Sequence, residues 1–175
     1  ERMVLAAVAA LLALLLFWLR GGLHPEAPLE RLARQSPDLS VGLTDGRPTL
    51  VEFYADWCEA CRAMAPAMEA LERQHRDSLN VVLLNVDNPR WQPEVERYAV
   101  DGIPHLELFD ANGGAVGRSL GARSPAELEG LITALVAAQP LPQLAGVGAI
   151  SALQDGPQPA GAGESGTSAG PRSHG

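Results

Sequence analysis

The sequence predicts an α/β domain, in which a central mixed β-sheet is flanked by helices, together with an N-terminal transmembrane helix. Three observations lead to this fold class. Seventeen uncharged residues, 3–19, stand near the start of the chain. Between residues 49 and 86, a strand pattern, a helix pattern and a second strand pattern follow one another, which is typical of a βαβ unit with a parallel strand pair and a right-handed crossover. Two more strand patterns and an amphipathic helix pattern complete the domain by residue 139.

The composition fits one domain with a buried core and argues against nucleic-acid binding. The chain is 46% hydrophobic and 19% charged, although part of the apolar content belongs to the N-terminal block. With 21 acidic residues against 13 basic ones, the formal net charge is −8. Proteins that bind DNA or RNA neutralise phosphates with a basic face, which this composition does not supply.

The N-terminal block is predicted to be an uncleaved membrane anchor. At about 1.5 Å per residue, a helix over residues 3–19 reaches about 25 Å, at the short end of what crosses a hydrocarbon core, and Trp18 stands at one edge like an interfacial anchor. The alternative is a cleaved signal peptide, but "RGGLHPEAP", which follows the block, has no A-x-A arrangement. Arg2 and Arg20 balance, so charge does not decide the orientation.

Residues 20–45 are predicted to be a juxtamembrane linker that contains one short helix. Gly and Pro are too dense at its start for regular structure. The stretch "PLERLARQ", residues 28–35, predicts a helix with Leu29 and Leu32 turned inward, and "TDGRP" marks a turn before the domain. The domain itself is predicted to span residues 46–139.

The elements of the sheet follow in order. Apolar runs bounded by turn residues predict strands, and a 3.6-residue period predicts helices. The expected elements are a strand from Thr49 ("TLVEFYA"), a helix from Cys58 to about His75, a buried strand ("LNVVLLNV"), a short helix ("PEVERYAV"), and a hairpin of "HLELF" and "AVGRSL" around the turn "DANGG".

The last helix has a well-specified start. Ser124, Pro125 and Glu127 fit the N-cap, the first helical position and the capping-box partner. One apolar stripe follows, made of Leu128, Leu131, Ile132, Leu135 and Val136. Residues 140–175 are rich in Pro, Gly, Ala and Ser with little to bury, so they are predicted to be a disordered tail.

The chain has only two cysteines, Cys58 and Cys61. A disulfide that closes so short a loop constrains the unfolded chain little, so a stapling role is disfavoured. A structural zinc site needs two further ligands, and the four histidines, at positions 24, 75, 105 and 174, form no closely spaced pair. We therefore expect no metal and no cofactor.

The sequence does supply the feature that thiol-disulfide exchange needs, which is two cysteines one helical turn apart. A C-x-x-C at a helix start places the first sulfur where unpaired N–H groups and the helix dipole favour a thiolate. The second sulfur lies one turn along, close enough to attack a mixed disulfide. The sequence therefore predicts Cys58 as the nucleophile and Cys61 as the resolving thiol, which together form a redox-active disulfide.

The stretch "VEFYADWCEACRAMAP" resembles the active-site segment of the thioredoxin family. In that family a strand ends in a Trp-Cys pair, C-x-x-C opens the next helix, and a proline follows five residues after the second cysteine, where this chain has Pro66. The resemblance covers about residues 46–138 and implies a thioredoxin fold. It also implies a cis bond between Ile103 and Pro104 in "GIPH", which lies against the sulfurs and, with Trp57, faces the substrate.

A narrower resemblance joins "EFYADWCEACR", "LNVDNPRW" and "GIPH" to the membrane-anchored thioredoxin-like proteins of cyanobacterial and chloroplast thylakoids. It implies a thiol-disulfide oxidoreductase that reduces disulfides of lumenal partners, such as apocytochromes, during c-type cytochrome and cytochrome b6f biogenesis. Electrons then come from a membrane thiol carrier of the CcdA type. The implied location is the thylakoid membrane with the domain in the lumen, or the plasma membrane with the domain facing the periplasm.

Two residues, Glu52 and Glu59, differ from those that ordinary thioredoxins have at these positions, and their roles can be interpreted in more than one way. Glu52 stands where thioredoxins usually place a buried Asp beneath the second cysteine, which implies that it takes the proton of Cys61 during resolution. The alternative is an outward-facing residue, because strand alternation puts Glu52 and Tyr54 on one side. Glu59 opposes the thiolate of Cys58 and favours a reductant. The other functions open to the chain are a thiol oxidase or isomerase, and a non-catalytic assembly factor that docks partners.

Overall fold

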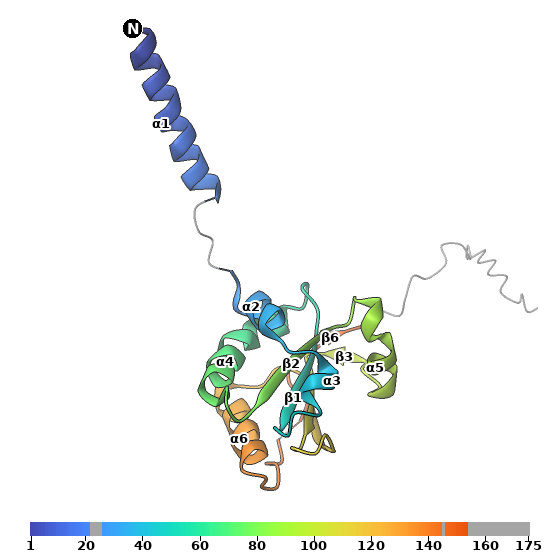
Figure 1. Cartoon of the computed structure of the whole chain (residues 1–175). Helices are drawn as coiled ribbons and strands as arrows, with labels where there is room; N and C mark the ends of the chain where they lie inside the picture. Colours follow the sequence, from blue (N-terminus) through green and yellow to red (C-terminus); the bar gives the residue numbers. More distant parts are fainter. Residues whose placement is uncertain (22–25, 145, 154–175) are drawn as a thin grey trace, which may run out of the picture.

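The computed structural model of the chain describes residues 1–21, 26–144 and 146–153. The N-terminal helix, α1 (Arg2–Gly21), covers the apolar block and stands apart from the rest of the described chain (Figure 1). Its large apolar side chains from Met3 to Trp18 are exposed. In the part of the chain whose side chains are described, no helix is both long and apolar enough to cross a membrane. The transmembrane role predicted for residues 3–19 is therefore not confirmed.

A four-stranded mixed sheet forms the centre of the domain, in the order β2-β1-β4-β5. As predicted, β1 runs parallel to β2, and β4 and β5 form an antiparallel hairpin. All six residues of β1 are buried, because this strand has a neighbour on each edge and helices over both faces. The strands are β1 (Thr49–Tyr54), β2 (Asn80–Asn85), β4 (His105–Phe109) and β5 (Ala115–Leu120).

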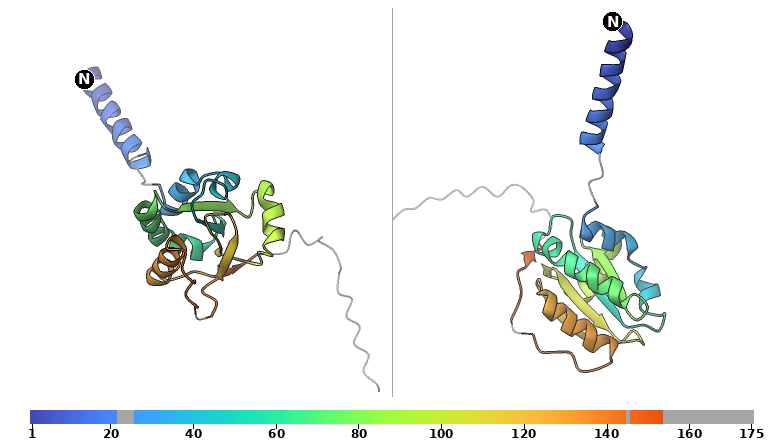
Figure 2. Two further views of the ribbon diagram at one scale, coloured as in Figure 1. Left: turned by 60° about the horizontal axis from the view of Figure 1, so that its bottom comes forward. Right: turned by 90° about the vertical axis from the view of Figure 1, so that its left-hand side faces the viewer.

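Helices cover both faces of the sheet. Figure 2 shows α4 and α6 side by side on one face and α5 on the other side of the sheet. A short 3-10 helix, η1, leads into α5. These elements are α4 (Glu59–His75), η1 (Pro89–Trp91), α5 (Gln92–Arg97) and α6 (Pro125–Val136).

Part of the segment predicted as a linker belongs to the packed domain. Helix α2 (Pro28–Gln35) buries Leu29 and Leu32, as predicted, and lies against α4 and β2. A second short helix that sequence reasoning did not predict, α3 (Leu39–Gly42), follows it. Its last carbonyl, of Gly42, accepts hydrogen bonds from the Thr49 hydroxyl and the Asn80 amide, which ties the segment to the first residues of β1 and β2.

The start of α6 is the predicted capping box. The Ser124 hydroxyl oxygen accepts the backbone N–H of Glu127, and the Glu127 carboxylate accepts the backbone N–H of Ser124. Replacing Ser124 by Ala is expected to lower the free energy of unfolding by about 1 kcal/mol. The backbone N–H of Glu127 loses its acceptor, and the reciprocal bond to the N–H of residue 124 loses the partner that fixes it. Urea unfolding measures this loss. Asn at position 124 keeps an acceptor and should unfold within a few tenths of a kcal/mol of the wild type; an equal loss in both variants would contradict the capping role.

The segment after α6 folds back onto the domain. Leu141, Leu144 and Leu153 pack against the core, and β6 (Ser151–Ala152) pairs in antiparallel orientation with β3 (Gly102–Ile103). The predicted disorder is therefore wrong for these residues. Their apolar side chains are too widely spaced to give a periodic pattern, and only the folded domain supplies surfaces for them. Residues 154–175 lie outside the described residues.

Candidate active site around the cysteine pair

Cys58 and Cys61 form a disulfide at the start of α4. The chain leaves β1 at Tyr54 and turns sharply, with the N–H of Cys58 donated to the carbonyl of Ala55 at 3.1 Å. This turn makes Cys58 the N-cap of α4, and its sulfur accepts the backbone N–H of Cys61 at 3.1 Å. A helix-start donor aimed at this sulfur stabilises negative charge on it when the pair is reduced. Both cysteines are fully buried.

Trp57, the residue before the pair, stands at the rim of a groove. The residue is 47% exposed, and its indole N–H donates to the Asp87 carboxylate at 2.9 Å. Asp87 lies two residues beyond the end of β2, so the turn that follows that strand supports the ring. The groove has a volume of about 570 Å³ and is lined by Trp57, Val86, Asp87, Gln92, Val95, Ala152 and Leu153.

The peptide bond between Ile103 and Pro104 is cis, as the resemblance implied. Both residues are buried. In the antiparallel pair of β1 and β4, Phe53 lies opposite His105. Pro104 therefore lies at the end of the sheet where β1 leads into the turn before Cys58, which places it on the same side of the domain as the cysteine pair.

Glu52 is a fully buried acid in the middle of the sheet. It lies opposite Leu83 on β2 and Leu106 on β4, and neither carboxyl oxygen has a hydrogen-bond partner among the described residues. Burial disfavours the charged form and raises the pKa of Glu52 to about 8. The outward-facing alternative is excluded, and the expected desolvation of this carboxyl is confirmed.

The fold and the site match known proteins. The family profile described as Thioredoxin matches residues 38–134 of the chain. The chain belongs to the thioredoxin family. Among curated relatives, it is 47% identical over 127 residues to the thiol:disulfide interchange protein TxlA homolog of Synechocystis, covering 73% of this chain and 71% of that protein.

More distant matches extend the resemblance. The chain is 38% identical over 150 residues to the chloroplastic thioredoxin-like protein HCF164 of Arabidopsis thaliana, covering 85% of this chain and 57% of that protein. Among solved structures, a mutant thioredoxin from Halobacterium salinarum matches with a TM-score of 0.51 and 32% identity, over 57% of this chain and 83% of that one.

The thioredoxin domain also holds a buried polar pair that sequence reasoning missed. His105 Nε2 lies 2.7 Å from Glu107 Oε1, and both side chains are buried. The His105 ring meets Phe53 edge-on at 5.7 Å between centroids. Residues two apart on a strand share a face, so the stretch "HLE" contained a signal for this pair. The pair stands directly after Pro104, on the opposite face of the sheet from Glu52.

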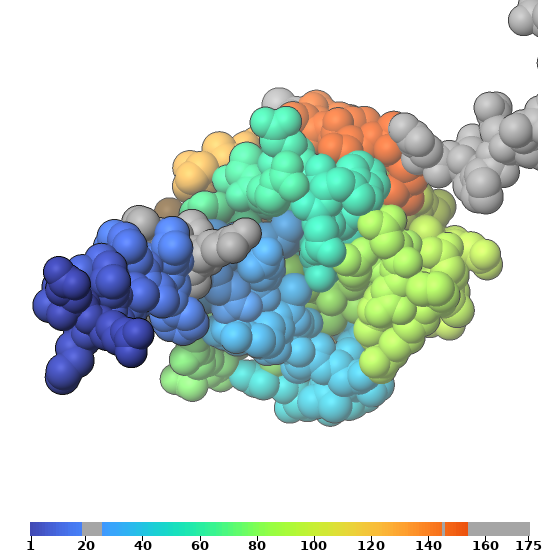
Figure 3. Space-filling view, turned by 90° about the horizontal axis from the view of Figure 1, so that it is seen from above, coloured from blue at the N-terminus to red at the C-terminus, as the bar shows by residue number. Residues whose placement is uncertain are grey.

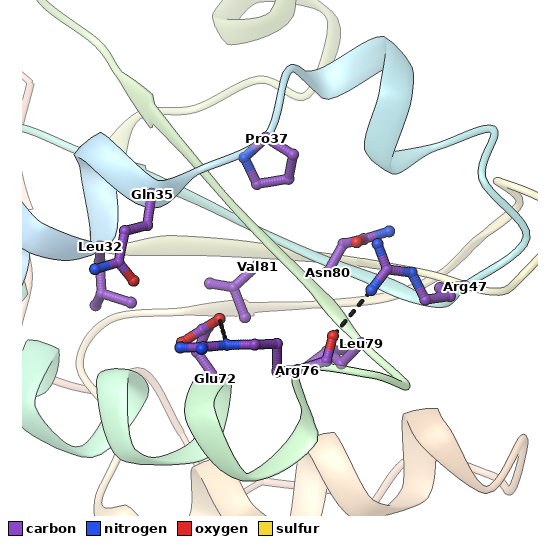
Figure 4. A pocket seen from close by; sticks show the side chains of 9 residues that line it. All are labelled: Leu32, Gln35, Pro37, Arg47, Glu72, Arg76, Leu79, Asn80 and Val81. Carbon is purple, nitrogen blue, oxygen red and sulfur yellow. Dashed lines mark hydrogen bonds and ion pairs between the residues drawn. The ribbon is translucent and has the colours of Figure 1, made fainter.

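A second hollow in the thioredoxin domain lies away from the cysteines. It has a volume of about 470 Å³ and lies between α2, α4 and β2 (Figure 4). Its charged side chains are already engaged: Arg76 pairs with Glu72, and Arg47 donates to the carbonyl of Arg76. Neither cysteine lines this hollow.

Proposed function

We propose that the chain is a membrane-anchored thiol-disulfide oxidoreductase that reduces disulfides in partner proteins. The observation that carries the proposal is the position of Cys58, which caps α4, receives a backbone N–H on its sulfur and is bonded to Cys61. The relatives named thiol:disulfide interchange proteins support the same activity.

The reaction begins with the pair reduced. The Cys58 thiolate attacks one sulfur of a partner disulfide, the partner's S–S bond breaks, and the partner's other sulfur leaves as a thiolate. Cys61, as its thiolate, then attacks the Cys58 sulfur of the mixed disulfide and releases the second partner sulfur. Two electrons pass from the cysteine pair to the partner, which ends as a dithiol after taking up two protons, while Cys58 and Cys61 end as a disulfide.

Glu52 is proposed to take the proton of Cys61 during the second attack. A carboxyl whose pKa lies at about 8 exchanges a proton readily near neutral pH, whereas an exposed carboxylate is too weak a base. Its burial inside the sheet, with no hydrogen-bond partner among the described residues, leaves its oxygens free for this exchange.

Trp57, Ile103 and Pro104 are proposed to face the partner. Trp57 is exposed at the groove rim, and the buried Ile103 belongs to β3, a two-residue strand outside the main sheet. A strand edge that is free of other pairing can bind an extended peptide through backbone hydrogen bonds. A disulfide in such a peptide would then be held near the end of the sheet from which Cys58 emerges.

The partners and location are proposed from the relatives and from the N-terminal block. Residues 3–19 carry no charge, and an exposed apolar helix gains free energy when a membrane covers it. The origin of the relatives in a cyanobacterium and a chloroplast supports a thylakoid location with the domain in the lumen. There, lumenal disulfides such as those of apocytochromes are the substrates, and a membrane thiol carrier of the CcdA type is the electron donor.

Trapping tests this proposal. With Ser at position 61, the mixed disulfide on Cys58 has no resolving thiol, so the full chain expressed in native membranes should accumulate in covalent complexes that reductant releases. Alkaline carbonate should leave these complexes in the membrane pellet. A chain with Ser at both 58 and 61 is the matched control and should capture nothing. Equal capture by both chains would contradict the mechanism, and complexes in the soluble fraction would contradict the anchor.

A further inference from the structure

One edge of β3 is occupied by a later segment of the same chain, residues 146–153. Ile103, the residue before the cis proline, lies opposite Ser151 in the antiparallel pair of β3 and β6, and Gly102 lies opposite Ala152. The pairing continues beyond β6, because the N–H of Leu153 is donated to the carbonyl of Asp101 at 3.2 Å. Figure 3 shows this segment, in orange, beside the turquoise surface around the start of α4.

The segment is seated by close backbone contacts. The N–H of Gly148 is donated to the carbonyl of Leu120, and the N–H of Ala122 to the carbonyl of Ala149. The buried Arg123 donates to the carbonyl of Gly146 at 3.0 Å. A Cβ on Gly148 would lie 2.0 Å from the carbonyl oxygen of Ala122, so only glycine permits this approach.

When residues 146–153 are in place, they cover the surface that a partner protein would contact. Ala152 and Leu153 line the same groove as Trp57, so the segment reaches the rim of the site. Both sulfur-bearing residues are fully buried with the segment in place. An edge that pairs with one antiparallel strand accepts another of the same kind, because backbone hydrogen bonds carry little sequence information.

From these contacts we propose that residues 146–153 are an intramolecular competitor of the partner protein. The edge of β3 binds either this segment or an extended polypeptide segment beside the partner's disulfide, and the partner gains access to Cys58 only when β6 leaves. The inference rests on the proposed function. Because only the open form binds, the apparent affinity for a partner is reduced by the fraction of chains that are open.

The test uses the full chain with Val in place of Gly148. A side chain there collides with the backbone of Ala122, so the segment cannot seat. With insulin as the partner and dithiothreitol as the reductant, the KM for insulin is expected to fall about tenfold while kcat changes less than twofold. Cys58 in the reduced variant should also react about tenfold faster with iodoacetamide. A synthetic peptide with the sequence of residues 147–153 should raise the KM of the variant again.

Controls separate this inference from the proposed function. Val147 is 62% exposed, so replacing it by Ala should leave both the KM and the alkylation rate unchanged. Should the Gly148 variant fail to fold, Leu153→Pro removes both the N–H donated to Asp101 and the packing of the Leu153 side chain, and it should produce the same fall in KM. An unchanged KM in a folded variant overturns the inference and leaves the reductase intact. No insulin reduction by any chain overturns the proposed function, and this inference with it.

Discussion

Replacing Cys58 by Ser is expected to lower the rate of insulin reduction by more than about 10³-fold, because the hydroxyl is neither ionised near neutral pH nor able to form a disulfide. The substitution tests chemistry rather than folding. Serine is a favoured N-cap residue, so the oxygen replaces the sulfur as acceptor of the Cys61 N–H and α4 keeps its start. Turbidity of reduced insulin, followed in the presence of dithiothreitol, measures the rate.

Two controls accompany the Cys58→Ser measurement. Far-UV circular dichroism of the Cys58→Ser chain should match the wild type, which shows that the domain is folded. Ser36, the C-cap of α2, accepts the backbone N–H of Leu83 on its hydroxyl oxygen. Ser36→Ala should leave the rate of insulin reduction within about twofold of the wild type. Identical turbidity curves for the wild type and the Cys58 variant would reject the reductase and favour a non-catalytic docking role.

Replacing Glu52 by Gln is expected to remove a large pH dependence of stability. The pKa of Glu52 is about 8 in the folded chain, well above the 4.5 of an exposed glutamate, because burial disfavours its charge. The folded chain therefore holds this proton more tightly than the unfolded chain does. Between about pH 4.5 and 8 the unfolded chain loses the proton first, so the stability of the wild type falls as the pH rises through this window.

The size of this pH dependence of stability follows from the pKa values of Glu52 in the folded and the unfolded chain, about 8 and 4.5. At about 1.4 kcal/mol per pH unit, the wild type should lose on the order of 5 kcal/mol between pH 4 and pH 9 relative to the Gln variant. Urea unfolding of both oxidised chains at the two pH values measures the difference. Glu96→Gln removes a charge from an exposed position and is the matched control, which should keep the wild-type dependence. Parallel stability curves for the wild type and the Glu52 variant would contradict the burial argument.

The Glu52→Gln variant also tests the proposed role of Glu52 in catalysis. Without a proton acceptor, the resolution of the mixed disulfide at pH 7 should slow by about 10²-fold, whereas the first attack by Cys58 should be unaffected. Stopped-flow measurement with a disulfide-linked peptide separates the first phase, the attack by Cys58, from the second phase, the resolution of the mixed disulfide. An unchanged second phase would remove Glu52 from the mechanism and leave its effect on stability intact.

Local patterns predicted most of the sheet and its helices. The strand from Thr49, the helix after Cys58 and the capping box at Ser124 were each visible as a short-range signal, because periodicity and end chemistry act within a few residues. Elements of two to four residues gave no such signal. The strands β3 and β6 are held by pairing with each other. Helix α3 is capped by Asp38 and tied to the sheet by the hydrogen bonds that Thr49 and Asn80 donate to its last carbonyl.

Strand alternation also left the position of Glu52 open. Alternation identifies the outer face of a strand only where one face meets water, and β1 is covered on both faces. The pattern could therefore place Glu52 and Tyr54 on one side without showing that this side is buried. The sequence likewise contained both His105 and Glu107 but not their burial, which depends on the segments packed over β4.

By itself, the sequence determined the reactive pair, its order and its place at a helix start, since these depend on residues within one turn of each other. Tertiary structure alone decided that Glu52 is desolvated, that the proline after Ile103 stands at the same end of the sheet as the sulfurs, and that residues 146–153 cover the edge beside it. The physical reason is separation along the chain: desolvation and edge pairing depend on groups dozens of residues apart, which no local pattern encodes.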